Sequence, residues 1–197
     1  MKPKTLLLIV FILVALVQLF VPYQMIRKQA GFAETGTEFK FKTENRFDPN
    51  FNGTSSDLSG KFIRLKFRED HLKIVDKKDW EYILNAYVEF TIDSSGFAKI
   101  KSVAGKKPVN SSDWVRAAVH VDWKDSTRLQ IYYPFSNYYI QDIRSKKVES
   151  VIKNGLCDTL KTNFLKIKLN ENQFVVGDLM IEGIPFKVMI EDTGKPN

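Results

Sequence analysis

Two patterns of hydrophobic and polar residues divide the chain. From Leu6 to Val21 every side chain except Gln18 is apolar, and with its flanks through Ile26 the run is about 22 residues, or about 33 Å of α-helix. That length covers the ~30 Å hydrocarbon core of a bilayer, where a helix satisfies its own backbone hydrogen bonds. The pattern predicts a single transmembrane helix within residues 1–29.

The residues after this run bear on whether it is cleaved. A signal peptide has a shorter apolar core, followed by small residues at the cleavage site. Here the first such pair is Ala30 and Ala33, which lies beyond Arg27 and Lys28. We therefore expect a retained signal-anchor, with a cleaved signal or a buried helix of a soluble protein as alternatives.

Charges on the two flanks predict the orientation. Lys2, Lys4 and the α-amino group precede the segment, and only Arg27 and Lys28 follow it closely. Because the more positive flank tends to stay in the cytoplasm, we expect the N-terminus inside and residues 30–197 outside the cell membrane.

In residues 30–197 apolar and polar side chains alternate, which is the period of a β-strand. Alternation predicts strands at residues 39–42, 62–67, 86–92, 97–103, 115–121, 129–133, 163–169, 173–180 and 185–191. The charged stretch 69–80 is expected to be a loop or an edge excursion. One helix is expected at about residues 143–154, ended by Gly155. The fold class is therefore mainly β, an antiparallel barrel or sandwich-like domain with one short helix, preceded by a single N-terminal transmembrane helix.

Composition narrows the possible partners. The net charge of +7 falls by two when Lys2 and Lys4 are assigned to the anchor, and the remaining surplus is spread along the strands. A dispersed surplus is typical of a solvated face with some attraction to anionic headgroups, and no clustered basic stripe predicts nucleic-acid binding. The single Cys157 excludes an intrachain disulfide and is expected to be a small buried hydrophobe.

The sequence offers little for catalysis or for metal binding. His71 and His120 lie in no zinc-binding spacing, so no metal or other cofactor is predicted. An anchor, a serine-bearing loop and a glycine-led strand together are similar to the layout of type I signal peptidases, which would make Ser55 or Ser56 the nucleophile and Lys99 or Lys101 its base. However, Ser56 is followed by Asp57 rather than by the hydrophobic residue and proline of that family.

The segment Gly60–Phe67, GKFIRLKF, resembles the GDYxxLxY motif of a family of bacterial membrane-anchored proteins of unknown function. Asp48-Pro49 ahead of it, PFSNYYIQD at residues 134–142 and DLMIEGIPF at residues 178–186 follow the family's order. The resemblance implies a bacterial cytoplasmic (inner) membrane location and a polytopic membrane protein as partner, since such relatives tend to be encoded beside one.

This chain departs from the motif at three positions. Lys61 replaces the family's acid, and Phe62 and Phe67 replace its two tyrosines. A lysine cannot act as a carboxylate base or as a ligand of a hard metal, and phenylalanine keeps the ring without the hydroxyl. We therefore interpret Gly60 as a residue of a tight turn, and Phe62, Leu65 and Phe67 as anchors of a core strand.

One candidate binding patch remains. Tyr138, Tyr139 and Asp142 fall together at a predicted strand-to-helix corner, although tyrosines there can equally cap a core. The function expected from the sequence is a non-catalytic accessory or interaction module of the bacterial envelope, not an enzyme. A ligand-binding envelope domain is the alternative, and the Ser-Lys peptidase is the least favoured.

Overall fold

The structure is a computed structural model, and it describes residues 35–44, 62–80, 82–140 and 146–191, together with residues 11, 14, 16–20 and 22–24. The chain forms two compact units, Met1–Gly36 and Thr37–Asn197. Residues 16–20 and 22–24 of the first unit are helical, and most of the predicted anchor lies outside the described residues. No helix within the described part of the chain is long and apolar enough to cross a membrane.

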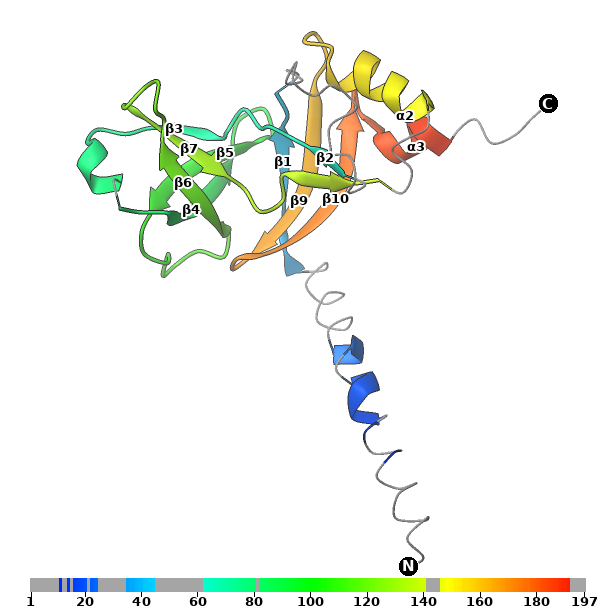
Figure 1. Cartoon of the computed structure of the whole chain (residues 1–197), viewed down its shortest axis with the longest axis horizontal. Coiled ribbons are helices and arrows are strands. Elements are labelled where there is room, and N and C mark those ends of the chain that lie inside the picture. Colours follow the sequence, from blue (N-terminus) through cyan, green and yellow to red (C-terminus); the bar gives the residue numbers. More distant parts are fainter. Residues whose placement is uncertain are drawn as a thin grey trace, which may run out of the picture. The chain divides into compact units, whose positions relative to one another are not determined.

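The second unit is mainly β, and its sheets are antiparallel (Figure 1). One sheet has four strands in the order β1-β9-β10-β11, and a short one pairs β2 with β8. Their bounds are β1 Thr37–Lys42, β9 Asn163–Asn170, β10 Gln173–Ile181, β11 Ile184–Pro185, β2 Phe62–Arg64 and β8 Asn137–Tyr139. This architecture confirms the predicted antiparallel β class.

The other sheet has five strands in the order β3-β7-β6-β4-β5. Their bounds are β3 His71–Lys73, β7 Arg128–Tyr132, β6 Trp114–Val121, β4 Asn85–Ile92 and β5 Ala98–Ala104. This sheet curves into a nearly closed, barrel-like wall (Figure 1). The stretch 69–80, expected to be a loop or edge excursion, contributes the edge strand β3 and the 3-10 turn η2, Lys77–Trp80.

Aromatic rings fill the space between the sheets. Phe39 and Phe41 of β1 are buried, because alternate residues of a strand point to one face. The Phe41 ring lies 5.0 Å from the rings of both Phe90 and Phe135 and 5.6 Å from that of Phe67. Rings from strands far apart in the sequence therefore form one core.

A two-residue turn joins the four-stranded sheet to the five-stranded one. Between β9 and β10, Glu171 and Asn172 both have positive φ, at 45° and 69°. The Glu171 N–H donates to the Ser112 carbonyl at 2.6 Å, and the Asn172 N–H donates to the Trp114 carbonyl at 3.0 Å. The Arg116 N–H donates to Oδ1 of Asn172 at 2.7 Å. The turn thereby supplies hydrogen-bond partners for backbone groups at the start of β6, where only β4 pairs with that strand.

The predicted helix at 143–154 is observed in part. Its described portion is α2, Lys146–Val151, which continues as the π-helical turn η3, Ile152–Leu156. Gly155, expected to end the helix, instead lies inside this turn. A Cβ there would be 2.9 Å from Cδ1 of Ile181, so close packing rather than termination explains the glycine.

A second helix corrects the predicted strand at 185–191. Only Ile184–Pro185 forms a strand, and residues Phe186–Glu191 form the helix α3. Phe186 is buried, and Met189 and Ile190 pack against the core. These positions have the i, i+3, i+4 spacing of one helix face, whereas Val188, which a strand would place beside Phe186, is exposed.

Candidate functional site

The motif residues form part of the core and of the connection between sheets. Leu65 and Phe67 are buried, as expected, whereas Phe62 is half-buried and faces the other side of the strand. The Arg68 N–H donates to the Lys42 carbonyl at 3.0 Å, so the segment pairs with the end of β1 as well as with β8. Gly60 lies outside the described residues.

The two candidate tyrosines lie on opposite faces of β8. Tyr138 is buried, and its ring packs 6.1 Å from that of Phe186. Burial raises the pKa of the Tyr138 hydroxyl. Tyr139 is 70% exposed, and its ring lies 5.9 Å from that of Phe62. The structure does not bring these rings to one surface, and Asp142 lies outside the described residues.

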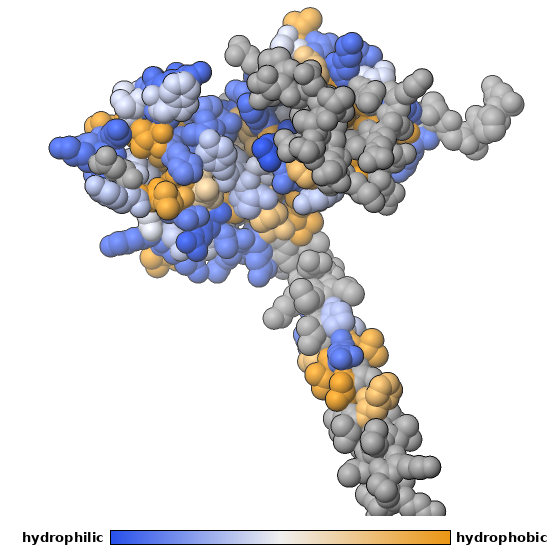
Figure 2. All heavy atoms as spheres, viewed as in Figure 1, coloured by the Kyte–Doolittle hydropathy of each residue, from blue (hydrophilic) through white to orange (hydrophobic). Residues whose placement is uncertain are grey.

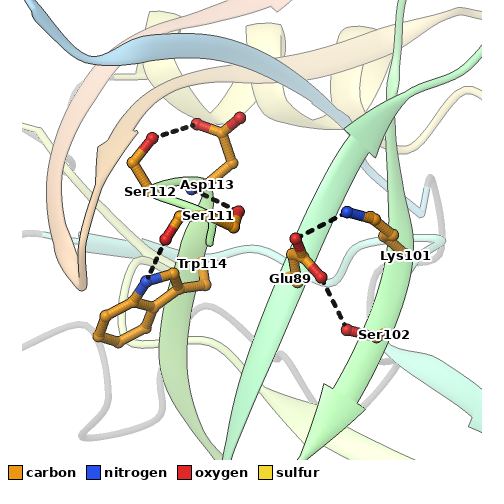
Figure 3. A network of polar contacts seen from close by, with 7 residues as sticks. All are labelled: Glu89, Lys101, Ser102, Ser111, Ser112, Asp113 and Trp114. Atoms are coloured by element: carbon orange, nitrogen blue, oxygen red, sulfur yellow. Dashed lines mark hydrogen bonds and ion pairs between the residues drawn. The ribbon is translucent and has the colours of Figure 1, made fainter. Parts of the chain in front are cut away.

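Lys101, a candidate base, is held by a carboxylate. Figure 3 shows Glu89 between Lys101 and Ser102: Lys101 Nζ lies 2.9 Å from Glu89 Oε1, and Ser102 Oγ lies 3.0 Å from Oε2. The hydrogen bond from Lys101 is the main cause of the lowered pKa of Glu89. The Lys101 side chain is 58% exposed, the opposite of the desolvated lysine that a Ser-Lys peptidase requires. Lys99 is exposed as well, and Ser55 and Ser56 lie outside the described residues.

His71 contacts a buried acid rather than standing alone. Its Nδ1 lies against Asp70 Oδ1 beside β3, and burial raises the pKa of Asp70 while His71 partly opposes that rise. Within the described residues, no group of three or more His, Cys, Asp or Glu side chains is placed to hold a metal ion. Cys157 is half-buried against the core, and burial raises the pKa of its thiol.

The outer face of the five-stranded sheet gathers aromatic and arginine side chains. We call it the ring face and define it by Tyr87 of β4, Arg116, Ala118 and His120 of β6, and Tyr132 of β7. Register places Tyr87 opposite Arg116 and Ala118 opposite Tyr132, and paired residues share a face of the sheet. Tyr132 is 56% exposed, and Arg116 and His120 are exposed too.

Contacts between rings orient the side chains at both ends of this face. The His120 and Tyr132 rings meet edge to face at 5.7 Å, and the Tyr87 ring meets Trp114 at 5.1 Å. At the Trp114 end, Lys107 Nζ lies 5.3 Å from the Trp114 ring centroid. Small Ala118 lies between the larger side chains, so the face presents oriented rings and a cation rather than an even apolar surface.

The sequence contains a signal for the ring face that alternation alone does not interpret. The positions that alternate with Val115, Ala117 and Val119 are Arg116, Ala118 and His120, and they point away from the core. The side chains that stand beside them depend on the strands that pair with β6 and on the register of that pairing, and both are tertiary properties.

No protein-family model, no curated protein and no solved structure matches the chain.

Proposed function

We propose that this chain is a single-pass protein of the bacterial cytoplasmic membrane. Its N-terminus would lie inside, and its β-rich domain outside would act as a non-catalytic interaction module. The run Leu6–Val21 is the main support for the anchor. Described side chains of this run, including Phe11, Leu16 and Leu19, are exposed on the helical unit, and Figure 2 marks apolar groups there. Membership in the GDYxxLxY family is part of the proposal and rests on the motif order alone.

The observation that carries the interaction role is the ring face. Tyrosine and arginine are enriched at protein interfaces because each buries a large area and still offers polar contacts. Tyr132, His120 and Arg116 lie together on a rigid sheet, so little conformational entropy is lost when a partner covers them. We propose a polytopic membrane protein as this partner.

The ligand-binding alternative receives less support. It relied on Tyr138, Tyr139 and Asp142 forming one polar patch, and Tyr138 is buried in the core. Of the two described members of that patch, Tyr139 offers one ring and one hydroxyl at the surface, too few groups to define a small-molecule site.

Site-specific photocrosslinking tests the proposed interface. A photoreactive phenylalanine analogue at Tyr132 should crosslink in native membranes to a protein with several membrane spans, identified by mass spectrometry. The same analogue at Leu160, which is 93% exposed away from the ring face, is the matched control. Arg116→Glu should reduce the Tyr132 adduct without changing the circular dichroism spectrum, since the Arg116 side chain is exposed.

Equal adducts from both positions, or none from Tyr132, would contradict the proposed interface. The His120→Glu variant provides a second check at a neighbouring exposed position.

A further inference from the structure

Lysines cluster on the outer face of the four-stranded sheet. Lys40 and Lys42 of β1 and Lys166 and Lys168 of β9 all point away from the buried phenylalanine, leucine and isoleucine residues of their strands. We call these four residues the lysine face. Figure 1 shows β1 and β9 side by side, as their antiparallel register requires.

The arrangement places like charges opposite each other. Register pairs Lys40 with Lys166 directly across β1 and β9. Like charges at such positions destabilise a sheet, so a sequence selected for stability alone would place a carboxylate on one strand. Nearby acids do not remove the excess: Glu38 lies opposite Lys168 at one end, and Asp93 and Lys42 attract each other at the other. Within the described residues no ion pair joins Lys40, Lys42 or Lys166 to a carboxylate.

Two phenylalanine rings lie among these ammonium groups. Lys42 Nζ is 4.1 Å from the Phe97 ring centroid, and Lys40 Nζ is 6.0 Å from that of Phe164. The two rings meet edge to face at 5.6 Å, and both are half-buried. Lysines combined with aromatic rings are the composition that proteins place at the boundary between lipid headgroups and acyl chains.

The lysine face follows the predicted anchor after a short stretch of sequence. Strand β1 begins at Thr37, 11 residues after Ile26, and a fully extended chain of that length spans at most about 40 Å. A tether this short gives the domain a high effective concentration at the bilayer surface, so weak contacts suffice to hold it there. Each lysine near an anionic surface raises the affinity by about fivefold.

We propose that the lysine face docks on anionic phospholipid headgroups of the membrane that holds the N-terminal segment. This inference rests on the proposed anchoring and adds the class of ligand and the surface that contacts it. The ring face belongs to a different sheet, so a protein partner and the lipid surface do not compete for the same residues.

Lysine footprinting of the full-length protein in nanodiscs tests the docking. Acetylation of Lys40, Lys42, Lys166 and Lys168 should fall about fivefold or more in discs containing phosphatidylglycerol compared with pure phosphatidylcholine discs. About 1 M salt should restore it, because the screening length falls to about 3 Å. Lys77, Lys78 and Lys124, which are exposed on other elements, are the internal controls.

A charge-reversal pair adds a second measurement. Lys40→Glu with Lys166→Glu should abolish protection of Lys42 and Lys168, whereas the charge-matched Lys77→Glu with Lys78→Glu should leave it intact. Thermal melts report whether either double variant unfolds the domain. If one of them does, the comparison of the two kinds of disc with the unsubstituted protein decides whether the lysine face docks. Failure of the chain to enter nanodiscs would overturn the anchor itself.

Two results would overturn the docking alone. One is stable insertion with equal lysine reactivity in both kinds of disc. The other is protection of these lysines by a soluble anionic polymer, such as teichoic acid, but not by phosphatidylglycerol.

Discussion

Glu89 illustrates how a charged residue is accommodated within the five-stranded sheet. Its residue surface is 8% exposed, and its two carboxylate oxygens contact Lys101 and Ser102 separately. The register of β4 and β5 shifts between Glu89 and Phe90, which leaves Lys101 as an extra residue on β5. This bulge lets Lys101 and its neighbour Ser102 both reach Glu89, whereas in a regular strand they would point to opposite faces. The same contact keeps Lys101 paired.

This geometry predicts a pH-dependent contribution to stability. Glu89→Gln should lower the free energy of unfolding at neutral pH by about 1 kcal/mol, a modest value because Lys101 is largely exposed. The folded-state pKa lies below the ordinary value of 4.5, so the stabilisation is present above that pH and is lost as the pH falls through the folded pKa. Urea titrations across this range should therefore show the variant and the original protein converging in acid.

Glu182→Gln is the control, because the Glu182 side chain is 56% exposed where it forms an ion pair with Lys161. A difference that stays constant down to the lowest pH would contradict the assigned role of the Glu89 carboxylate.

At the scale of elements, the β9–β10 turn determines how the two larger sheets meet. Its positive φ values suit the right-handed twist of a hairpin, and Asn tolerates them better than most residues. Asn172 has a second role, because its side-chain oxygen accepts the Arg116 N–H at the unpaired edge of β6. A local turn preference and a long-range contact therefore meet in one residue.

Asn172→Ala should destabilise the domain by about 2 kcal/mol, since it loses that hydrogen bond and puts alanine, which tolerates positive φ less well than asparagine, in the left-handed region. Asn172→Asp is the matched control: its carboxylate can still accept the Arg116 N–H, and aspartate tolerates positive φ. Differential scanning calorimetry should rank the aspartate variant near the original and well above the alanine variant. Equal losses would mean that the Arg116 contact contributes nothing.

At the scale of the whole molecule, Thr37–Asn197 contains the aromatic core, and Met1–Gly36 contains the apolar run. This division suits a tethered domain that does not need the N-terminal segment for its core. The N-terminal unit would then bring the chain to a membrane, and the lysine face would orient the domain at that surface.

The anchor is tested by extraction and by protease access. The protein should stay in vesicles during an alkaline carbonate wash, and protease added to intact spheroplasts should digest the β-rich domain. Leu8→Arg with Val14→Arg should release the protein, because each arginine in the middle of a transmembrane helix costs about 3 kcal/mol of insertion energy. Release of the original protein, or protection of its domain from external protease, would contradict the proposed topology.

Local patterns were enough to predict most of the strands. β1, β4, β5, β6, β7, β9 and β10 all coincide with strands predicted from alternation, because a strand with one buried face imposes period two on its own residues. β5 and β10 depart from strict alternation where their registers shift. The apolar run at residues 6–21 is likewise a local property, and it supports the anchor proposal whatever the rest of the chain does.

Tertiary packing decided the remainder. The seven residues 185–191 fit the period of a strand and that of a helix. The helix forms because it lets Phe186, Met189 and Ile190 pack together against the core. Gly155 matched a helix-ending signal, but the reason for the glycine is the nearby Ile181. Such neighbours come from distant parts of the sequence, and alternation cannot reveal them.

The same reason explains the two candidate surfaces. That Arg116 and Lys40 point outward follows from the sequence pattern, since each alternates with buried residues. That Arg116 meets Tyr87, and Lys40 meets Lys166, follows only from strand order and register, which are set when the whole sheet assembles around its core.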